Sequence, residues 1–166
     1  MGGYERLEEV PVSALPRLGS RGQGWVWGQF VLAAVVLGTA AIGPRWSWPG
    51  TSWLGAALIV LGGGLGLWSL ATLGDSLSPY PKPRRSGELV EHGPYRVVRH
   101  PIYSSLLMAL LGVCFVGSGW ALLPLAGLLA WWLGKAHIEE AWLCDHYPGY
   151  PAYCERVPHR IIPMIL

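Results

Sequence analysis

The chain has little charge and little cysteine. Only 13% of its 166 residues are Asp, Glu, Lys or Arg, about half of the roughly 25% usual in soluble domains. The formal net charge is +2 and no run of Lys and Arg is present, which argues against nucleic acid as a partner. Cys114, Cys144 and Cys154 form no C-x-x-C pair and match no zinc-finger spacing with His, so we interpret them as free thiols and expect no metal site.

Apolar residues dominate instead, at 52% of the chain, with ten Trp. Four apolar segments stand out, at residues 25–42, 53–73, 102–116 and 120–133. A membrane-spanning helix needs roughly 17 to 25 residues, so the last two segments span only if residues 101–103 and 134–137 continue their helices. Gly117-Ser118-Gly119 between them is typical of a tight helical hairpin. The sequence therefore predicts an all-α integral membrane protein, a bundle of about four transmembrane helices.

The basic residues predict how this bundle is oriented. Eleven of the twelve Lys and Arg lie before the first span, between the second and third spans, or after the fourth, and Arg45 is the exception. This asymmetry places both termini and the 74–101 loop in the cytosol. Residues 1–24 are then a cytosolic N-terminal segment without a signal peptide, and residues 25–166 form one membrane domain.

Two further expectations concern the membrane boundaries. An aromatic belt is expected on the face opposite the cytosol, made of Trp46, Trp48, Trp53 and Trp120. The C-terminal tail, residues 142–166, is amphipathic and is expected to lie along the cytosolic interface. Its apolar residues expected at the headgroup boundary are Ile161, Ile162, Met164, Ile165 and Leu166.

Glycines in the second span have two possible roles. Gly62 and Gly66 stand in G-x-x-x-G spacing, which lets helices approach closely in lipid. Alternatively, Gly64-Leu65-Gly66 could form the floor of a cofactor groove, although helix packing is the favoured interpretation. A dinucleotide fingerprint is excluded, because no strand precedes these glycines.

Two polar clusters flank the predicted hairpin. His100 and Tyr103 are three residues apart at the start of the third helix, where Pro101 suits the first turn. Lys135 and Glu139 are four apart at the end of the fourth. The simpler interpretation is an interfacial Lys–Glu pair with its carboxylate in water, a His100 that caps the helix or contacts a headgroup, and an interfacial Tyr103. The hairpin, however, brings both clusters to the same end, and ionisable groups at membrane depth usually mark a site.

These residue types suit a small zwitterionic ligand. His100 and the amides of a helix N-terminus can receive a carboxylate, Glu139 an amine or a ribose hydroxyl, and Tyr95 or Tyr103 can stack on a ring. The chain has no nucleophile elbow, H-E-x-x-H or Walker loop. Chemistry supplied by a bound cofactor is therefore the natural interpretation.

In combination, several motifs resemble a known family. They are Glu88-Leu89-Val90, Gly93-Pro94-Tyr95, Arg99-His100-Pro101-x-Tyr103, Glu139-Glu140-x-x-Leu143, and Tyr150 and Tyr153 followed by Val157 and Ile162-Pro163. Over about residues 60–166 this pattern resembles the isoprenylcysteine carboxyl methyltransferase family, whose relatives include the phospholipid N-methyltransferases. The resemblance implies an integral membrane enzyme that binds S-adenosylmethionine in a cytosol-facing pocket between its last helices.

The same resemblance implies roles for individual residues within 87–103 and 135–160. Lys135 stands where the prenylcysteine enzymes place an Arg for the substrate carboxylate, and Ser105 stands where a glycine is common. Both departures from the family pattern concern the identity of the methyl acceptor more than the use of S-adenosylmethionine. The implied cofactor-binding residues are Gly87, Glu88, Leu89, Val90, Tyr95, His100, Pro101, Ile102, Tyr103, Glu139 and Glu140.

The expected function is therefore methyl transfer from S-adenosylmethionine to a hydrophobic or lipid-like acceptor at the cytosolic membrane face. A carboxylate acceptor needs no base, whereas an amine or thiol would need one, and His100 and Glu140 are the nearest candidates. One alternative is an NADPH-dependent membrane reductase of the sterol-reductase type, which has a similar R-H-P-x-Y element but a much longer chain. Another is a non-catalytic lipid-binding membrane protein.

Overall fold

The computed structural model describes residues 18–163, and its regular secondary structure is helical. Its long helices are α2 (Gln23–Ile42), α3 (Gly50–Leu73), α4 (Pro101–Val116) and α5 (Leu122–His146), followed by the short α6 (Tyr150–Arg156). Short 3-10 turns are η2 (Gly74–Ser76), η3 (Gly93–Arg96) and η4 (Gly119–Ala121). Within residues 18–163 the β-structure is a single isolated bridge between Arg45 and Ser118. The prediction of an all-α bundle is confirmed.

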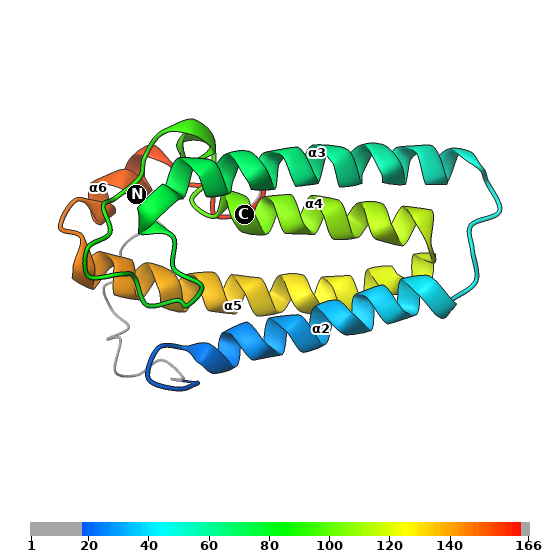
Figure 1. Ribbon diagram of the computed structural model, residues 1–166, viewed down its shortest axis with the longest axis horizontal. Helices are drawn as coiled ribbons and strands as arrows, with labels where there is room; N and C mark the ends of the chain where they lie inside the picture. The colour runs from blue at the N-terminus through cyan, green and yellow to red at the C-terminus, as the bar shows by residue number, and fades with distance from the viewer. Residues whose placement is uncertain (1–17, 164–166) are drawn as a thin grey trace.

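The four long helices run side by side as two pairs, α3 along α4 and α2 along α5 (Figure 1). One end, here called the polar end, carries the 77–100 loop, α6 and residues 157–163 (Figure 1). The far end carries the α2–α3 connection, residues 43–49, and the turn between α4 and α5 (Figure 1). The expected hairpin of the third and fourth spans is therefore present, and both of its polar clusters lie at the polar end.

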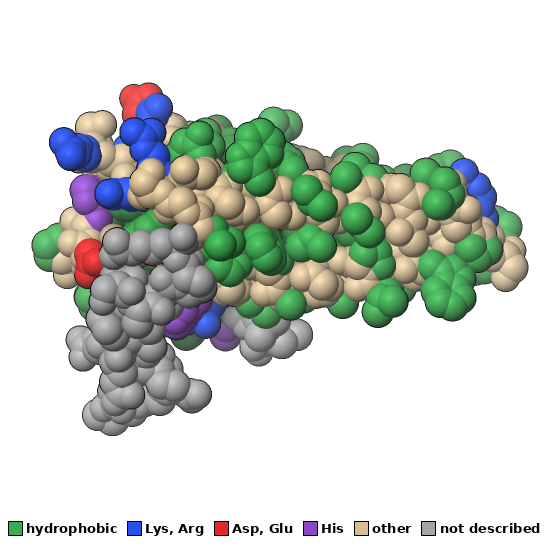
Figure 2. Space-filling model, turned by 90° about the horizontal axis from the view of Figure 1, so that it is seen from below, with side chains coloured by type: hydrophobic (Ala, Val, Ile, Leu, Met, Phe, Trp, Pro, Cys, Tyr) green, Lys and Arg blue, Asp and Glu red, His purple; other side chains and the backbone are tan. Residues whose placement is uncertain are grey.

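The bundle has the surface of a membrane protein. Three helical stretches are long and apolar enough to cross a membrane, Gln23–Ile42, Gly50–Ser76 and Gly119–His146, whereas Pro101–Val116 is shorter. Along the flank of the bundle hydrophobic side chains are scattered without charged ones, and most of the charged side chains gather at the polar end (Figure 2). The sequence predicted that the fourth segment could span a membrane only if its helix continued beyond Leu133. The helix α5 does continue, and it ends at His146.

Glycine contacts set the distance between α3 and α4. A Cβ added to Gly62 would lie 2.7 Å from the Ala109 nitrogen and 2.7 Å from the Ser105 carbonyl oxygen. A Cβ at Gly66 would lie 3.1 Å from the Ser105 hydroxyl, whereas one at Gly64 would meet no atom within 4 Å. Close helix packing, the favoured interpretation of the G-x-x-x-G pattern, is therefore confirmed.

The C-terminal tail differs from expectation at Ile161. This side chain is fully buried in the core of the bundle and does not lie at the membrane boundary. The cause is a backbone pairing, in which the Arg99 N–H donates to the His159 carbonyl at 2.9 Å and the His100 N–H to the Arg160 carbonyl at 2.8 Å. This pairing holds the tail against the start of α4. The predictions for Met164, Ile165 and Leu166, and for residues 1–17, concern residues outside the described range.

Candidate functional site

A cavity of about 340 Å³ lies at the polar end, bounded by α2, α3, α4, α5 and the 76–90 loop. Cavities from about 300 Å³ upward hold small molecules. Part of the lining is apolar: Val26 and Phe30 of α2, Leu70 and Leu73 of α3, and Leu106 of α4. The polar part includes Gln29, Glu88, Arg99, His100, Tyr103, Lys135, Glu139 and the tyrosines Tyr80, Tyr95, Tyr147, Tyr150 and Tyr153. The cavity thus joins an apolar wall to a charged one.

Three stacked rings lie beside the polar part, and two of them, His100 and Tyr103, line the cavity. The rings of His100 and Tyr103 stack 5.3 Å apart, and those of Tyr103 and Trp132 stack 5.8 Å apart. Because Pro101 begins α4 directly after His100, residues 100 and 103 share one face of the first turn. The N–H groups of Tyr103 and Ser104 donate to the His100 carbonyl. Those two amides are therefore engaged within the helix and are not free to receive a ligand carboxylate.

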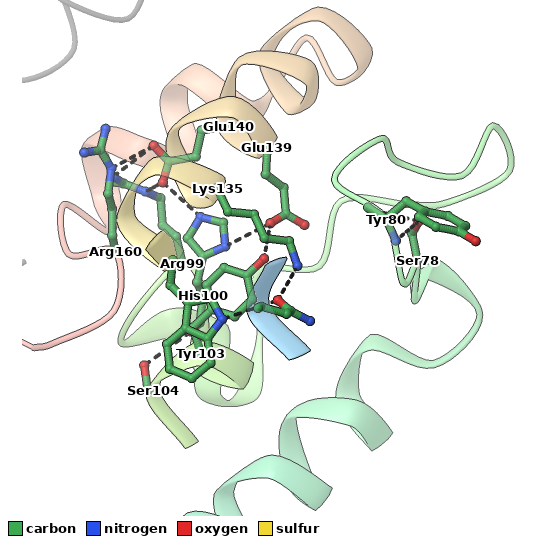
Figure 3. Close-up of polar contacts among 12 residues, drawn as sticks. Ser78, Tyr80, Arg99, His100, Tyr103, Ser104, Lys135, Glu139, Glu140 and Arg160 are labelled. Atoms are coloured by element: carbon green, nitrogen blue, oxygen red, sulfur yellow. Dashed lines mark hydrogen bonds and ion pairs between the residues drawn. The ribbon is translucent and has the colours of Figure 1, made fainter. Parts of the chain in front are cut away.

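Glu139 presents its carboxylate to the cavity. The Tyr103 hydroxyl donates to Glu139 Oε2 at 2.6 Å, and His100 Nδ1 lies 3.8 Å from the same oxygen (Figure 3). The Glu139 side chain remains 21% exposed and lines the cavity. It can therefore accept hydrogen bonds from an amine or hydroxyl of a bound molecule while Tyr103 holds it in place.

The neighbouring Glu140 is engaged in a separate network, the Glu140 clasp, made with Arg99, His100 and Arg160. Its fully buried carboxylate lies 2.8 Å from Arg99 Nε, 3.0 Å from Arg160 Nε and 3.1 Å from His100 Nε2 (Figure 3). Burial opposes the charged form of Arg99, but the adjacent Glu140 carboxylate outweighs burial and raises the pKa of the guanidinium. The clasp therefore joins α5, the start of α4 and the tail through charged groups.

Lys135 is held by a residue from another helix. Its Nζ donates to Gln29 Oε1 of α2 at 2.8 Å and lies 5.2 Å from the centre of the Tyr103 ring. The same Gln29 oxygen accepts from Trp132 Nε1 at 3.3 Å. Gln29 was not predicted from the sequence, although an amide side chain inside the apolar run 25–42 is the kind of signal that marks a site at membrane depth.

Buried tyrosines complete the polar part of the cavity. The Tyr153 hydroxyl donates to the Tyr95 carbonyl at 2.7 Å, which connects α6 to η3. Burial, followed by the charge of Glu139, raises the pKa of Tyr95, and burial likewise raises that of Tyr153. Both hydroxyl groups therefore stay protonated at neutral pH and remain hydrogen-bond donors.

Cys154 of α6 packs in the same cluster and is expected to be unreactive. Burial raises the pKa of its thiol to about 12, and only the thiolate is alkylated at a useful rate. We expect Cys154 to remain unmodified by iodoacetamide at pH 8 in the folded protein and to be modified in SDS, as measured by mass spectrometry of peptides. Equal labelling in both conditions would contradict this burial.

The structure brings together most of the residues predicted for the site. Two predicted residues do not line the cavity: Glu140, which forms the clasp, and Gly87, where an added Cβ would lie 2.8 Å from the Tyr147 hydroxyl. The α2 residues Val26, Gln29 and Phe30 and the loop residues 76–81 and 83 were missed, because the sequence places them at the cytosolic end but does not show which of them face the cavity. The predicted residues that do line it are Glu88, Leu89, Val90, Tyr95, His100, Pro101, Ile102, Tyr103, Lys135 and Glu139.

Comparison with known proteins gives a family and two relatives. The profile of the family described as "Phospholipid methyltransferase" matches residues 51–149. The "Cobalt-zinc-cadmium resistance protein CzcN" of Cupriavidus metallidurans is 33% identical over 132 residues, 78% of this chain and 57% of that protein. The "Nickel-cobalt-cadmium resistance protein NccN" of Alcaligenes xylosoxydans xylosoxydans is 32% identical over 134 residues, 77% and 60% of the two proteins. The chain thus spans about three fifths of these curated relatives.

Proposed function

The chain belongs to the phospholipid methyltransferase family, and from that premise we propose that it transfers a methyl group from S-adenosylmethionine to a hydrophobic acceptor at the cytosolic membrane face. The single observation that carries this proposal is the cavity, which joins a charged wall around Glu139 to an apolar wall on α2, α3 and α4. A methyltransferase for lipid-like acceptors needs both, because the donor is polar and the acceptor is not.

The chemistry of the cavity's polar groups fits S-adenosylmethionine. Glu139 offers a carboxylate to its amino group or ribose hydroxyls, and the His100–Tyr103 stack and Tyr95 offer ring surfaces. Residues 88–90 line the same space from the loop. When bound, S-adenosylmethionine supplies a methyl group already activated on a sulfonium. The contribution of the protein is then to orient the acceptor and to exclude water.

Lys135 is the residue we propose for orienting the acceptor. Its ammonium lies at the inner end of the charged wall, held by the neutral Gln29 and only 4% exposed. The resemblance to the prenylcysteine enzymes favours a carboxylate acceptor, which this cation would attract as a point charge without the bidentate fork of an Arg. Apolar side chains such as Phe30, Leu70 and Leu106 would contact the hydrophobic part of the acceptor.

An amine or thiol acceptor would need a base, and the clasp distinguishes the two candidates. The Glu140 carboxylate already accepts from Arg99 and Arg160 and contacts His100, so it has little capacity to take a further proton. His100 lines the cavity directly. We therefore propose His100 as the base for such acceptors and assign Glu140 a structural role.

Calorimetric titration of S-adenosylmethionine and of NADPH into the detergent-purified protein tests this proposal. We expect saturable binding of S-adenosylmethionine, weakened about tenfold or more in Glu139→Ala and His100→Ala, because a hydrogen bond to a charged group contributes roughly 1.5–3 kcal/mol. Glu91→Ala is the matched control, since Glu91 pairs with Arg156 and does not line the cavity.

Other outcomes of the titration would replace the proposal. Binding of NADPH alone would indicate a reductase of the sterol-reductase type. If neither compound binds to protein whose circular dichroism shows it folded, the enzyme proposal is contradicted and a binding or structural membrane protein remains. Equal losses in Glu91→Ala and Glu139→Ala would show that the cavity is not where S-adenosylmethionine binds.

A further inference from the structure

A second hollow, here called the far-end groove, lies at the opposite end of the bundle from the cavity. This open groove of about 710 Å³ runs between the α2–α3 connection and the start of α5. Its lining includes Arg45, Trp46, Trp120, Leu122, Leu123 and Ala126. The methyl-transfer proposal makes no use of these residues.

Arg45 is the one charged residue in this region of the chain. No other Asp, Glu, Lys or Arg occurs between Arg21 and Asp75, and none occurs between Arg99 and Lys135. Its side chain is exposed, and no carboxylate within residues 18–163 forms an ion pair with it. The far-end groove therefore carries one positive charge that no acidic residue of the described chain neutralises.

The backbone and one hydrogen bond fix the position of this charge. Arg45 pairs with Ser118 in the isolated β-bridge, and its Nη1 donates to the Val116 carbonyl at 3.2 Å. A guanidinium has five N–H donors in a planar fork, so most of them remain available to a ligand. Arg is the side chain best suited to phosphate, because its fork can donate two parallel hydrogen bonds.

The apolar part of the far-end groove is preformed. Trp46 donates its indole N–H to the Cys114 carbonyl at 2.9 Å, and its ring lies 5.8 Å from that of Phe115. Gly119 leaves room for this ring, since a Cβ there would lie 2.8 Å from it. Trp120 is 67% exposed and Leu123 is 76% exposed. An apolar surface thus begins beside Arg45 at the fixed ring of Trp46 and continues along α5.

We propose that the far-end groove binds an anionic phospholipid, with its phosphate on Arg45 and an acyl chain along Leu122, Leu123 and Ala126. Trp side chains are enriched at the level of lipid headgroups, where Trp46 and Trp120 would lie. The headgroup preference follows from charge. Both kinds of headgroup offer a phosphate to Arg45. A zwitterionic lipid also brings an ammonium group, which would lie near the guanidinium in a region without an acidic residue to receive it, whereas an anionic lipid adds no positive charge.

Native mass spectrometry of the full chain, titrated with phosphatidylglycerol and phosphatidylethanolamine of identical acyl chains, tests the proposal. We expect wild type to prefer phosphatidylglycerol. Arg45→Gln should weaken its binding about fivefold, since a basic residue near an anionic headgroup contributes about 1 kcal/mol. Ala126→Trp, at an exposed position, should also weaken it by filling the path of the acyl chain. Arg85→Gln, at an exposed residue of the polar-end loop, is the matched control and should keep the affinity of wild type.

Two results would overturn this assignment. One is equal affinity of the wild type for both lipids. The other is loss of phosphatidylglycerol binding in Arg85→Gln but not in Arg45→Gln, which would place the lipid at the polar end. Binding of S-adenosylmethionine, measured on the same samples, is expected to be unaffected by Arg45→Gln. The lipid measurement therefore tests the far-end groove independently of the proposed methyltransferase function.

Discussion

Glu140→Ala is expected to lower the free energy of unfolding by about 3–5 kcal/mol, the range found when one partner of a buried ion pair is removed. The carboxylate is fully buried and satisfies two guanidinium groups and an imidazole. Without it, Arg99, only 7% exposed, becomes a buried cation without its counter-charge. The attachment of the tail should weaken as well, because Arg160 loses its partner and only the backbone pairing and the buried Ile161 still hold the tail against α4.

Glu139→Ala is the matched control, one residue earlier on the same helix. Glu139 accepts from the Tyr103 hydroxyl and is partly exposed, so its loss leaves one buried donor unsatisfied, at about 1–3 kcal/mol. Unfolding in detergent by added SDS, followed by circular dichroism, measures both variants. We expect the larger loss of stability in Glu140→Ala. In the calorimetric titration, we expect the loss of affinity for S-adenosylmethionine in Glu139→Ala to come from the missing contact with the carboxylate and not from lost stability. Equal destabilisation by the two substitutions would contradict the distinct placement of these carboxylates.

Gly62→Ala is expected to destabilise the bundle by about 1–3 kcal/mol, the range for overpacking a close contact. The added methyl group would lie 2.7 Å from backbone atoms of both Ser105 and Ala109, and backbone atoms can move away only if the helices separate. Separation of α3 from α4 would displace the His100–Tyr103 stack at the start of α4. We therefore also expect weaker binding of S-adenosylmethionine in this variant.

Gly63→Ala, at the next position of α3, is the matched control. A Cβ there meets no atom within 4 Å, and alanine is favoured over glycine within a helix by about 1 kcal/mol. Substitution at Gly63 should therefore leave stability unchanged or raise it, while the same substitution at Gly62 lowers it. The same SDS titration compares them, and a loss at Gly63 as large as that at Gly62 would show that α3–α4 contact is not the cause.

The helices of this protein follow from local properties of the chain. Uninterrupted apolar runs of sufficient length have to form helices in a bilayer, because only a helix satisfies its own backbone hydrogen bonds there. Gly117 to Gly119 divide the last two spans, and Pro101 begins α4, as expected from the preferences of those residues. The hairpin then brings His100 and Tyr103 to the same end as Lys135 and Glu139, so the main features of the site could also be predicted.

Only the tertiary structure shows that Glu139 lines the cavity whereas Glu140 forms the buried ion pairs. Both are acidic and adjacent in sequence, but neighbouring residues on a helix point about 100° apart. One therefore faces the cavity, and the other faces Arg160, which reaches it only because the tail pairs with residues 99 and 100. Gln29 and Ile161 are further examples, since each acquires its partners from elements distant in the chain. Sequence periodicity specifies the face of a helix, but the element that covers that face depends on how the whole chain packs.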